Sequence, residues 1–515
     1  MTHPMKYDVA IVGYGPVGVT AANLLGQLGL NVLVVERDPD IYARARAIST
    51  DEEVLRIWQQ VGLADRLNAD MLPGCGASFV DAQGVPFVKL LPAPRGNGHP
   101  PQQFIYQPAL EKVLRAGVDR FPNVSVLLEH ECLRVVQKPD HAELMLADLT
   151  VDKFRRVRAS YVIAADGGSS AIRAQLGVGF SGRTYAERWI VIDTKVIEEW
   201  PGHDRLRFHC NPERPTVDCP TPLGHHRWEF PVRDEEDERD LLDEAEIWKV
   251  LRGQGISEKN VAILGFACYS HHVRFADRWR VGRVFLAGDA AHAMPPWIGQ
   301  GMCAGVRDVA NLCWKLGAVL QNQLPESVLD SYPAERLPHV REVTNRAVKT
   351  GKIIIQRNRF RAAARNHIFR TASRFPYFLD WLREHRWLPD ARCTDGLVAN
   401  SGNGAEGWLI PQPWVVDEKN DTVRLDDVTG GRWTVLYTGS PADSRDWRSV
   451  GVPTLRVTPA GTAPAPDSIV DTDGSLIRWL EKKRATAVAV RPDGFVYAGA
   501  SPDQPLPPPP AGFRA

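Results

Sequence analysis

Residues 7–36 read YDVAIVGYGPVGVTAANLLGQLGLNVLVVE, and this stretch decides the fold of the N-terminal region. An apolar strand at 7–12 runs into a glycine turn at 13–18, a helical pattern follows, and a second strand at 31–35 ends on Glu36. Strand, glycine turn, helix, strand and acid in this order are typical of a dinucleotide-binding unit. The helix start would meet a pyrophosphate, and the acid would bind a ribose hydroxyl.

A second informative stretch reads GRVFLAGDAAHAMPPWIGQG at residues 282–301. An apolar strand ends at Gly288-Asp289, where the carboxylate can accept hydrogen bonds from sugar-like hydroxyls. Two prolines stiffen the next loop, and Gly299 and Gly301 permit a backbone that aims free N–H groups outward at the start of a helix. Because such a helix start favours negative charge, we predict one acid and one helix N-terminus facing the same small volume.

The composition excludes several classes of partner. The 515-residue chain has 62 Lys plus Arg and 62 Asp plus Glu, so no global charge favours nucleic acid or an anionic membrane. The first residues carry no signal pattern and no stretch approaches the ~20 apolar residues of a membrane helix, so we expect a cytoplasmic protein. The eight cysteines lack metal-type spacing, and we interpret them as reduced, semi-buried residues with no metal site.

The rest of the chain changes character along its length. Residues 185–270 are rich in strands and turn signals and predict an antiparallel sheet, whereas helices dominate from 301 to about 386. Residues 395–413 look like a linker, followed by a small α/β domain and a tail at 502–515 that we expect to be disordered or extended. Other predicted helices lie at 53–67, 107–120, 240–252 and 473–483, and further strands at 160–165, 189–196, 206–210, 227–232, 261–269, 433–437, 454–457 and 487–491.

Three motifs of this chain resemble those of the single-component FAD-dependent aromatic hydroxylases, and their order and spacing cover nearly the whole sequence. They are the glycine turn at 13–18, the Asp166-Gly167 turn, and Gly288-Asp289 with the loop at 296–302. Within this family, the segment RWEF at 227–230 and residues 332–339 look most like the 3-(3-hydroxyphenyl)propionate hydroxylase branch.

The resemblance implies an α/β fold with a discontinuous Rossmann-like FAD-binding domain, an antiparallel β-sheet substrate domain and a C-terminal thioredoxin-like domain. The FAD-binding domain is expected at 1–75, 103–180 and 275–394, and the substrate domain at 76–102 and 181–274. The linker at 395–413 then leads to the thioredoxin-like domain at 414–515. No cysteine follows Cys393, so we expect this domain to be structural or used for association, which would allow a homodimer.

The resemblance also implies which residues bind FAD. Asp289 would bond the ribityl chain, and the backbone at 299–302 would face the flavin pyrimidine ring. The loop residues expected nearest the chemistry are Pro296, Gly299, Gln300 and Gly301. The full set of implied cofactor-binding residues is Gly13, Gly15, Pro16, Val17, Gly18, Glu36, Arg37, Arg46, Gln107, Asp166, Gly167, Gly288, Asp289, Pro296, Gly299, Gly301 and Met302.

Candidate substrate contacts come from the predicted antiparallel sheet. His209, Arg214 and Trp228 lie there, and Arg214 could hold a carboxylate bidentately. The alternative interpretation of Arg214 is an exposed arginine at the sheet edge. We assign no residue as the base that removes a proton from a phenol.

The implied reaction uses NADPH or NADH to reduce FAD, after which O2 adds and the flavin hydroperoxide hydroxylates a small phenolic substrate. No second βαβ unit exists and Glu36 would repel a 2′-phosphate, so the nicotinamide cofactor is expected to bind transiently in a shared groove. One alternative is oxygenation, including Baeyer-Villiger insertion, of a larger polycyclic or antibiotic-like substrate. An alternative of another class is a non-catalytic nucleotide-binding module.

Overall fold

The N-terminal βαβ unit forms as predicted. The computed structural model describes residues 6–43, 46–73, 76–233, 235–384, 386–439 and 444–514. In it, strand β1 (Lys6–Val12) leads through the glycine turn into helix α1 (Pro16–Gln27) and strand β2 (Val32–Val35). All of β2 and the last four residues of β1 are buried, as expected for parallel strands covered on both faces.

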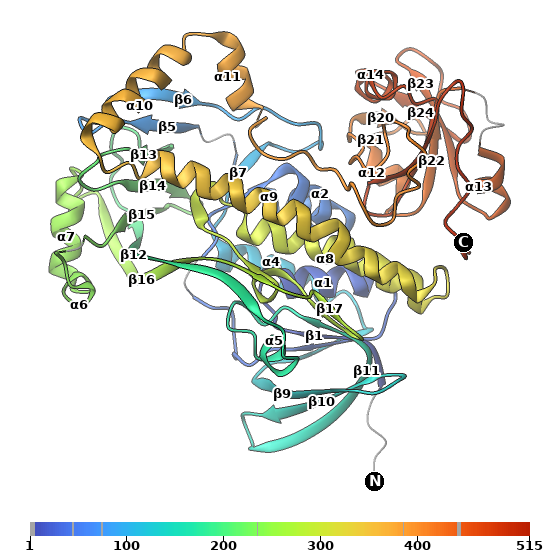
Figure 1. Cartoon of the computed structure of the whole chain (residues 1–515), viewed down its shortest axis with the longest axis horizontal. Helices are drawn as coiled ribbons and strands as arrows, with labels where there is room; N and C mark the ends of the chain where they lie inside the picture. Colours follow the sequence, from blue (N-terminus) through green and yellow to red (C-terminus); the bar gives the residue numbers. More distant parts are fainter. Residues whose placement is uncertain are drawn as a thin grey trace.

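Strands from distant parts of the chain complete this sheet (Figure 1). Five of them run parallel in the order β8-β2-β1-β11-β18, with β17 beside β18 and with β10 and β9 extending from β11. Helices α4 (Gln107–Val118) and α8 (Gly301–Leu320) pack against α1. The added strands are β8 (Val124–Leu127), β9 (His130–Gln137), β10 (Ala142–Asp148), β11 (Lys153–Ala164), β17 (Arg280–Val281) and β18 (Val284–Leu286).

The predicted antiparallel sheet is the second layer of the molecule. Its eight strands follow the order β19-β16-β12-β15-β14-β13-β5-β6, and all neighbours are antiparallel except β13 and β5. The strand β14 was not predicted. The members are β5 (Ala77–Val80), β6 (Pro86–Leu90), β12 (Phe180–Val196), β13 (Leu206–His209), β14 (Thr216–Thr221), β15 (His225–Pro231), β16 (Val261–Ala276) and β19 (His292–Ala293).

The two faces of this sheet carry separate cores. Ile190 and Trp228 belong to a core beneath helix α7 (Glu244–Gly253) on the outer face. Trp189 and Val217 belong to another core on the inner face, together with Trp297. Because neighbouring residues of a strand point to opposite faces, a shift of one residue decides which core a side chain enters.

Two predicted helices are each divided in the structure. The helix expected at 53–67 is α2 (Glu52–Gln60) and α3 (Ala64–Asn68), separated by Gly62 with φ of +69°. The helix expected at 240–252 is α6 (Glu238–Leu241) and α7, because Asp243 caps the second helix by accepting a hydrogen bond from the Ala245 backbone N–H at 2.8 Å.

A small sheet and a group of helices connect these layers. Helix α9, with 24 residues, crosses the front of the molecule in Figure 1. The small sheet consists of β3 (Ser49–Asp51), β4 (Leu72–Pro73) and β7 (Gln102–Phe104). The helices are α5 (Ala171–Gln175), η1 (Gly288–Ala290), η2 (Pro296–Ile298), η3 (Glu326–Asp330), α9 (Ser331–Ile354), α10 (Arg359–Ala372) and α11 (Pro376–Arg383).

The C-terminal part forms a mixed seven-stranded sheet in the order β21-β20-β24-β23-β22-β25-β26. Its similarity to thioredoxin and the exact domain boundaries stay predictions. The elements are β20 (Trp414–Val416), β21 (Thr422–Arg424), α12 (Leu425–Thr429), β22 (Thr434–Tyr437), α13 (Arg445–Ser449), β23 (Thr454–Pro459), β24 (Ser468–Asp471), α14 (Ser475–Lys482), β25 (Ala487–Val490) and β26 (Val496–Ala500).

Buried ion pairs attach the C-terminal sheet to the rest of the molecule. The fully buried Glu335 of α9 contacts Arg491 at 2.8 Å and Lys315 at 2.9 Å. Residues 502–514 were predicted to be disordered or extended, and the structure shows them extended. Trp447 holds this tail by donating a hydrogen bond from Nε1 to the Pro507 carbonyl at 2.8 Å. The Glu335–Arg491 ion pair thus joins the C-terminal sheet to helix α9.

Two predictions about the whole chain concern membranes and cysteines. No helix in the described ranges has the length and apolar character needed to cross a bilayer. Seven of the eight cysteines are described, and all seven are free thiols, six of them buried. Cys75 lies outside the described residues.

Candidate active site

A cavity of about 860 Å³ runs between the parallel sheet and the inner face of the antiparallel sheet. Of the predicted cofactor residues, Gly18 and Gly288 lie behind its wall. The others line it: Gly13, Gly15, Pro16, Val17, Glu36, Arg37, Arg46, Gln107, Asp166, Gly167, Asp289, Pro296, Gly299, Gly301 and Met302, as does the predicted loop residue Gln300. The structure therefore brings three motifs from distant parts of the sequence to one cavity.

The three glycines of the first turn are needed for different reasons. A Cβ at Gly13 would lie 2.3 Å from the Ala165 carbonyl oxygen, and a Cβ at Gly18 would lie 1.9 Å from the Gly13 oxygen. These two positions are restricted by the chain itself. Gly15 has nothing within 4 Å of its Cβ position and lines the cavity, so its backbone is accessible to a ligand.

The first turn of α1 offers free hydrogen-bond donors to the cavity. Gly15 precedes the helix without a side-chain cap, no acid lies in the first turn, and the first intrahelical bond is Val19 N–H to the Gly15 carbonyl at 2.9 Å. Nearby, the Glu36 carboxylate accepts a hydrogen bond from the Tyr14 N–H at 2.7 Å. An uncapped helix start of this kind stabilises a phosphate.

The Asp166-Gly167 turn, between β11 and α5, is held by Arg173. Its guanidinium donates to the Gly168 carbonyl at 2.8 Å and to the Ala290 carbonyl at 2.9 Å, so it ties the turn to the loop after β18. The Asp166 carboxylate accepts hydrogen bonds from the Ser170 hydroxyl at 2.6 Å and the Ile172 N–H at 3.2 Å. Burial nevertheless raises the pKa of Asp166. Its side chain supports α5, whereas Gly167 leaves open space beside the cavity.

Two acids lie beside the loop after β18, and they have different surroundings. Asp289 is exposed to the cavity, and its carboxylate makes no hydrogen bond within the described residues. Asp308 is fully buried behind the loop and accepts hydrogen bonds from the Gly288 N–H at 3.1 Å, from His292 at 2.7 Å and from Arg336 at 3.0 Å. Burial alone would raise the pKa of Asp308, but its contacts with His292 and Arg336 hold it below its usual value.

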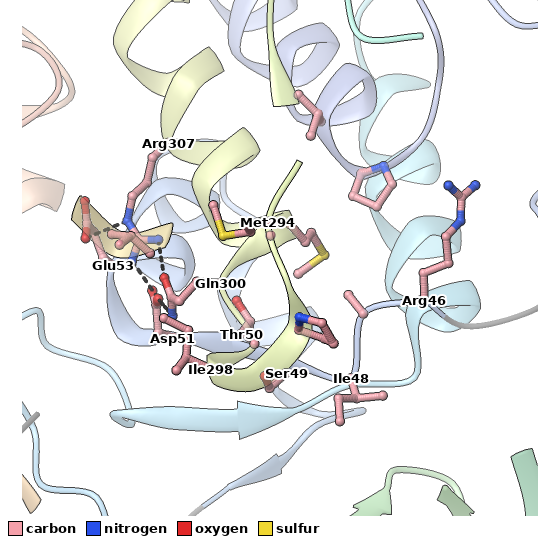
Figure 2. Close-up of a pocket in the computed structure, with 18 of the residues that line it drawn as sticks. Arg46, Ile48, Ser49, Thr50, Asp51, Glu53, Met294, Ile298, Gln300 and Arg307 are labelled. Atoms are coloured by element: carbon pink, nitrogen blue, oxygen red, sulfur yellow. Dashed lines mark hydrogen bonds and ion pairs between the residues drawn. The ribbon is translucent and has the colours of Figure 1, made fainter. Parts of the chain in front are cut away.

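The loop before α8 turns sharply at Gly299, whose φ is +64°. Helix α8 then begins with no side-chain cap and no acid in its first turn, so its N–H groups face the cavity. Figure 2 shows the side chain of Gln300 directed toward Asp51 and Arg307. Gln300 donates to Asp51 at 3.0 Å and accepts from Arg307 at 3.0 Å, and Arg307 also pairs with Glu53 at 2.7 Å. This network fixes the loop and leaves its backbone free to bind.

Gln107 and Arg227 hold the segment around Arg46. The buried Gln107 side chain accepts hydrogen bonds from the Arg46 and Ala47 backbone N–H groups at 2.8 and 2.7 Å, and Arg227 donates to the Arg46 carbonyl at 3.1 Å. The Arg46 side chain itself is exposed and lies across the view from Asp51 in Figure 2. The amide of Gln107 therefore positions the chain, whereas Arg46 is available to a ligand.

The structure does not bring the three candidate substrate contacts to the cavity. His209 bonds to the buried Asp218 at 2.6 Å, and Trp228 lies in the outer-face core. Arg214 pairs with Glu236 and is mostly buried, so it is not an exposed edge residue either. The strands that carry His209 and Trp228 were predicted at the right places, but these two side chains point to the opposite face, and Arg214 lies in the connection before β14.

The adjacent residues on these strands line the cavity instead. They are Phe208 and Glu229, which line the cavity together with Val217 of β14 and with Met294 and Trp297 of the loop before α8. The period-two pattern of the strands could have located them only if the inner face had been known. Residues 408–411 and Trp479 of the C-terminal part also line the cavity, and no motif in the sequence indicated this.

The fold, the two uncapped helix starts and the exposed acid define a protein that binds FAD. The family model described as FAD binding domain matches residues 6–347, and the model described as HcaD C-terminal domain matches residues 407–507. More narrowly, the chain belongs to the single-component FAD-dependent aromatic hydroxylases.

Two curated relatives show this membership. The chain is 33% identical over 510 residues to the 3-(3-hydroxy-phenyl)propionate/3-hydroxycinnamic acid hydroxylase of Burkholderia cenocepacia, covering 96% of this chain and 94% of that protein. It is 33% identical over 513 residues to the enzyme of the same name from Escherichia coli K12, covering 96% and 92%. The protein is therefore an enzyme, which replaces the non-catalytic alternative.

Solved structures share the fold over nearly the full length. The flavin-dependent monooxygenase PieE, in complex with FAD and substrate, superposes with a TM-score of 0.83 at 24% identity and 96% coverage of both chains. Aklavinone-11 hydroxylase, in a ternary complex with FAD and aklavinone, gives a TM-score of 0.78 at 23% identity and the same coverage. The residues of this chain fit FAD, because Gly15 leaves open space where the uncapped α1 start meets the cavity, and Gly167 leaves open space at the turn before α5.

Proposed function

We propose that this enzyme hydroxylates a small phenolic acid of the 3-(3-hydroxyphenyl)propionate class, with NADH or NADPH as reductant and O2 as co-substrate. The observation that carries this proposal is one continuous cavity. It joins the Gly15 turn to an apolar compartment walled by Phe208, Val217 and Trp297. A compartment of this character suits one aromatic ring, and the relatives at 33% identity are named for such a substrate.

The residues proposed to hold FAD follow its length. Gly13, Gly15 and the α1 start would bind the pyrophosphate, and Glu36 the adenosine ribose. Arg46 would contact the cofactor from its exposed side chain, and Asp289 would accept hydrogen bonds from the ribityl hydroxyls. When bound, FAD accepts a hydride from the nicotinamide nucleotide and activates O2 for transfer of one oxygen atom to the ring.

The chain supports this chemistry by electrostatics and by exclusion of water. Negative charge in the pyrimidine half of the reduced cofactor would meet the uncapped N–H groups of α8, an interaction of about 0.3–1 kcal/mol when exposed and up to ~2 kcal/mol when partly buried. These dipoles are fixed by the Gln300, Asp51 and Arg307 network before the reaction starts. The apolar compartment keeps water from the reacting ring.

The reductant and the cellular setting are part of the proposal. Glu36 disfavours a 2′-phosphate at the first unit, so the nicotinamide nucleotide would bind transiently in the same groove. We further propose a cytoplasmic enzyme, in which the C-terminal part has a structural role or mediates a homodimer.

The test is a substrate panel on the purified, FAD-loaded enzyme. Simple phenols, phenolic acids and polycyclic aromatics would each be scored by stimulation of NADH and NADPH oxidation and by product mass. The proposal expects phenolic acids to give the largest stimulation and a product with one added oxygen on the ring. Preference for a polycyclic compound, or ring insertion of oxygen, would favour the alternative oxygenation chemistry instead.

A further inference from the structure

One ionisable side chain lies on the apolar wall that the antiparallel sheet presents to the cavity. Among the described strand residues of that sheet, the cavity-lining side chains are Ala77, Phe79, Leu90, Leu206, Phe208 and Val217, with Glu229 as the single acid. Glu229 is 9% exposed. A carboxylate placed among apolar groups is costly unless it is paired, so its environment needs an explanation.

The pairing of Glu229 is incomplete. Arg227, two residues earlier on the same face of β15, is bound bidentately by Asp193 at 2.7 and 3.0 Å. The Glu229 carboxylate is 3.9 Å from the Arg227 guanidinium, which also donates to the Arg46 carbonyl. Two carboxylates therefore share one arginine, and Asp193 has the closer contact.

Tyr269 supplies the remaining partner of Glu229. It lies on β16 opposite Trp189, and each of Tyr269 and Glu229 shifts the pKa of the other, so the two side chains are neighbours. Burial raises the pKa of Tyr269 well above its usual value, so the hydroxyl stays protonated and acts as a donor. Glu229 thus has a protonated hydroxyl as a neighbour and keeps acceptor capacity toward the cavity.

The charged and titratable neighbours come from four strands. Arg227 lies on β15, Asp193 on β12, Tyr269 on β16 and the buried thiol Cys219 on β14. Burial raises the pKa of Glu229; the charge of Arg227 opposes this rise, Asp193 adds to it, and Tyr269 opposes it. The carboxylate is therefore a stronger proton acceptor than an exposed glutamate.

We propose that Glu229 is a catalytic residue that accepts the hydrogen bond of the substrate phenol and takes its proton during oxygenation. This inference rests on the proposed function. The phenol O–H bond breaks, an O–H bond forms on Glu229, and the electron pair left on the oxygen makes the ring more nucleophilic. A C–O bond forms between the attacked carbon and one atom of O2, and the hydrogen displaced from that carbon leaves as a second proton, which joins the other oxygen atom on its way to water. Glu229 returns its proton to the phenol oxygen when the ring becomes aromatic again.

Binding gives the first test, independent of turnover. A phenolic acid and its O-methyl ether would be titrated by calorimetry into FAD-loaded wild type, Glu229→Gln and the control Glu236→Gln, whose acid lies away from the cavity. A hydrogen bond to a charged acceptor is worth about 10- to 150-fold in affinity. Wild type and the control should prefer the phenol by that factor, and Glu229→Gln, whose amide oxygen accepts without a charge, should lose most of the preference. An equal preference in all three proteins overturns the proposal.

The pH profile gives the second test. Glu229→Gln should lower kcat by about 10²- to 10⁴-fold near neutral pH, with partial recovery as the pH approaches the phenol pKa of ~10. Tyr269→Phe, which keeps the ring, should move the acid limb of kcat/KM to higher pH because the donor that favours ionised Glu229 is lost. Unchanged profiles in both variants overturn the proposal. A wild type that no phenol stimulates would instead contradict the proposed function.

Discussion

The contrast between Gly15 and Gly18 provides the sharpest prediction about the cofactor site. In Gly18→Ala, the new Cβ would lie 1.9 Å from the Gly13 oxygen and 3.4 Å from Ile11 Cγ2, so helix and strand must separate. Overpacking of this kind costs about 1–3 kcal/mol, and backbone contact places it at the upper end. In Gly15→Ala, φ is −73° and the space is open, so the free energy of unfolding should fall by less than about 1 kcal/mol.

The same pair should differ in FAD binding. A methyl group on Gly15 keeps the pyrophosphate from the free N–H groups of α1, each worth about 1.5–3 kcal/mol toward a charged acceptor. Losing one such contact weakens FAD binding about 10- to 150-fold. Urea unfolding of the apoprotein and fluorescence titration with FAD measure the two quantities separately. The reasoning fails if Gly15→Ala binds FAD like wild type, or if it destabilises the apoprotein as much as Gly18→Ala.

Three further predictions concern acids in and behind the site. Asp289→Ala should weaken FAD retention with the fold kept, and unchanged flavin affinity would contradict its role. Asp308→Asn should lower the free energy of unfolding by about 3–5 kcal/mol, because Arg336 would stay buried without its anion. Since the folded pKa of Asp308 is lowered, its contribution should be complete above the unfolded pKa of ~3.9 and lost as the pH falls through the folded value; flat urea stabilities across acid pH would argue against this. Glu335→Gln should similarly cost ~3–5 kcal/mol and increase hydrogen exchange at β25, whereas Glu342→Gln on the same helix, an exposed partner of Arg346, should change stability by less than ~1 kcal/mol.

Local sequence patterns predicted the elements whose signals are themselves local. The order of strand, glycine turn, helix and acid located β1, α1 and β2 because each step has its own steric reason. The division of the helix at 53–67 also had a local signal in Gly62, which the apolar pattern concealed. The parallel sheet itself required family resemblance, because β1 pairs with residues about 150 positions away.

The contents of the site were less predictable for two physical reasons. One is the alternation of side chains along a strand, which sends neighbouring residues to opposite faces. His209 and Trp228 were chosen, but the residues that line the cavity are their neighbours Phe208 and Glu229. The other is sequence distance. Gln300 and Asp51 are 249 positions apart, and no spacing rule connects them. Side-chain networks of this kind become visible only after the fold has assembled.

Isotope incorporation tests the central claim most directly. The FAD-loaded enzyme would be supplied with labelled O2, NADH or NADPH and a phenolic acid, and the product analysed by mass spectrometry. The account predicts one labelled oxygen atom on the aromatic ring for each nicotinamide nucleotide oxidised. Oxidation of the nucleotide without label in any phenolic product, or a product whose new oxygen comes from water, would contradict it.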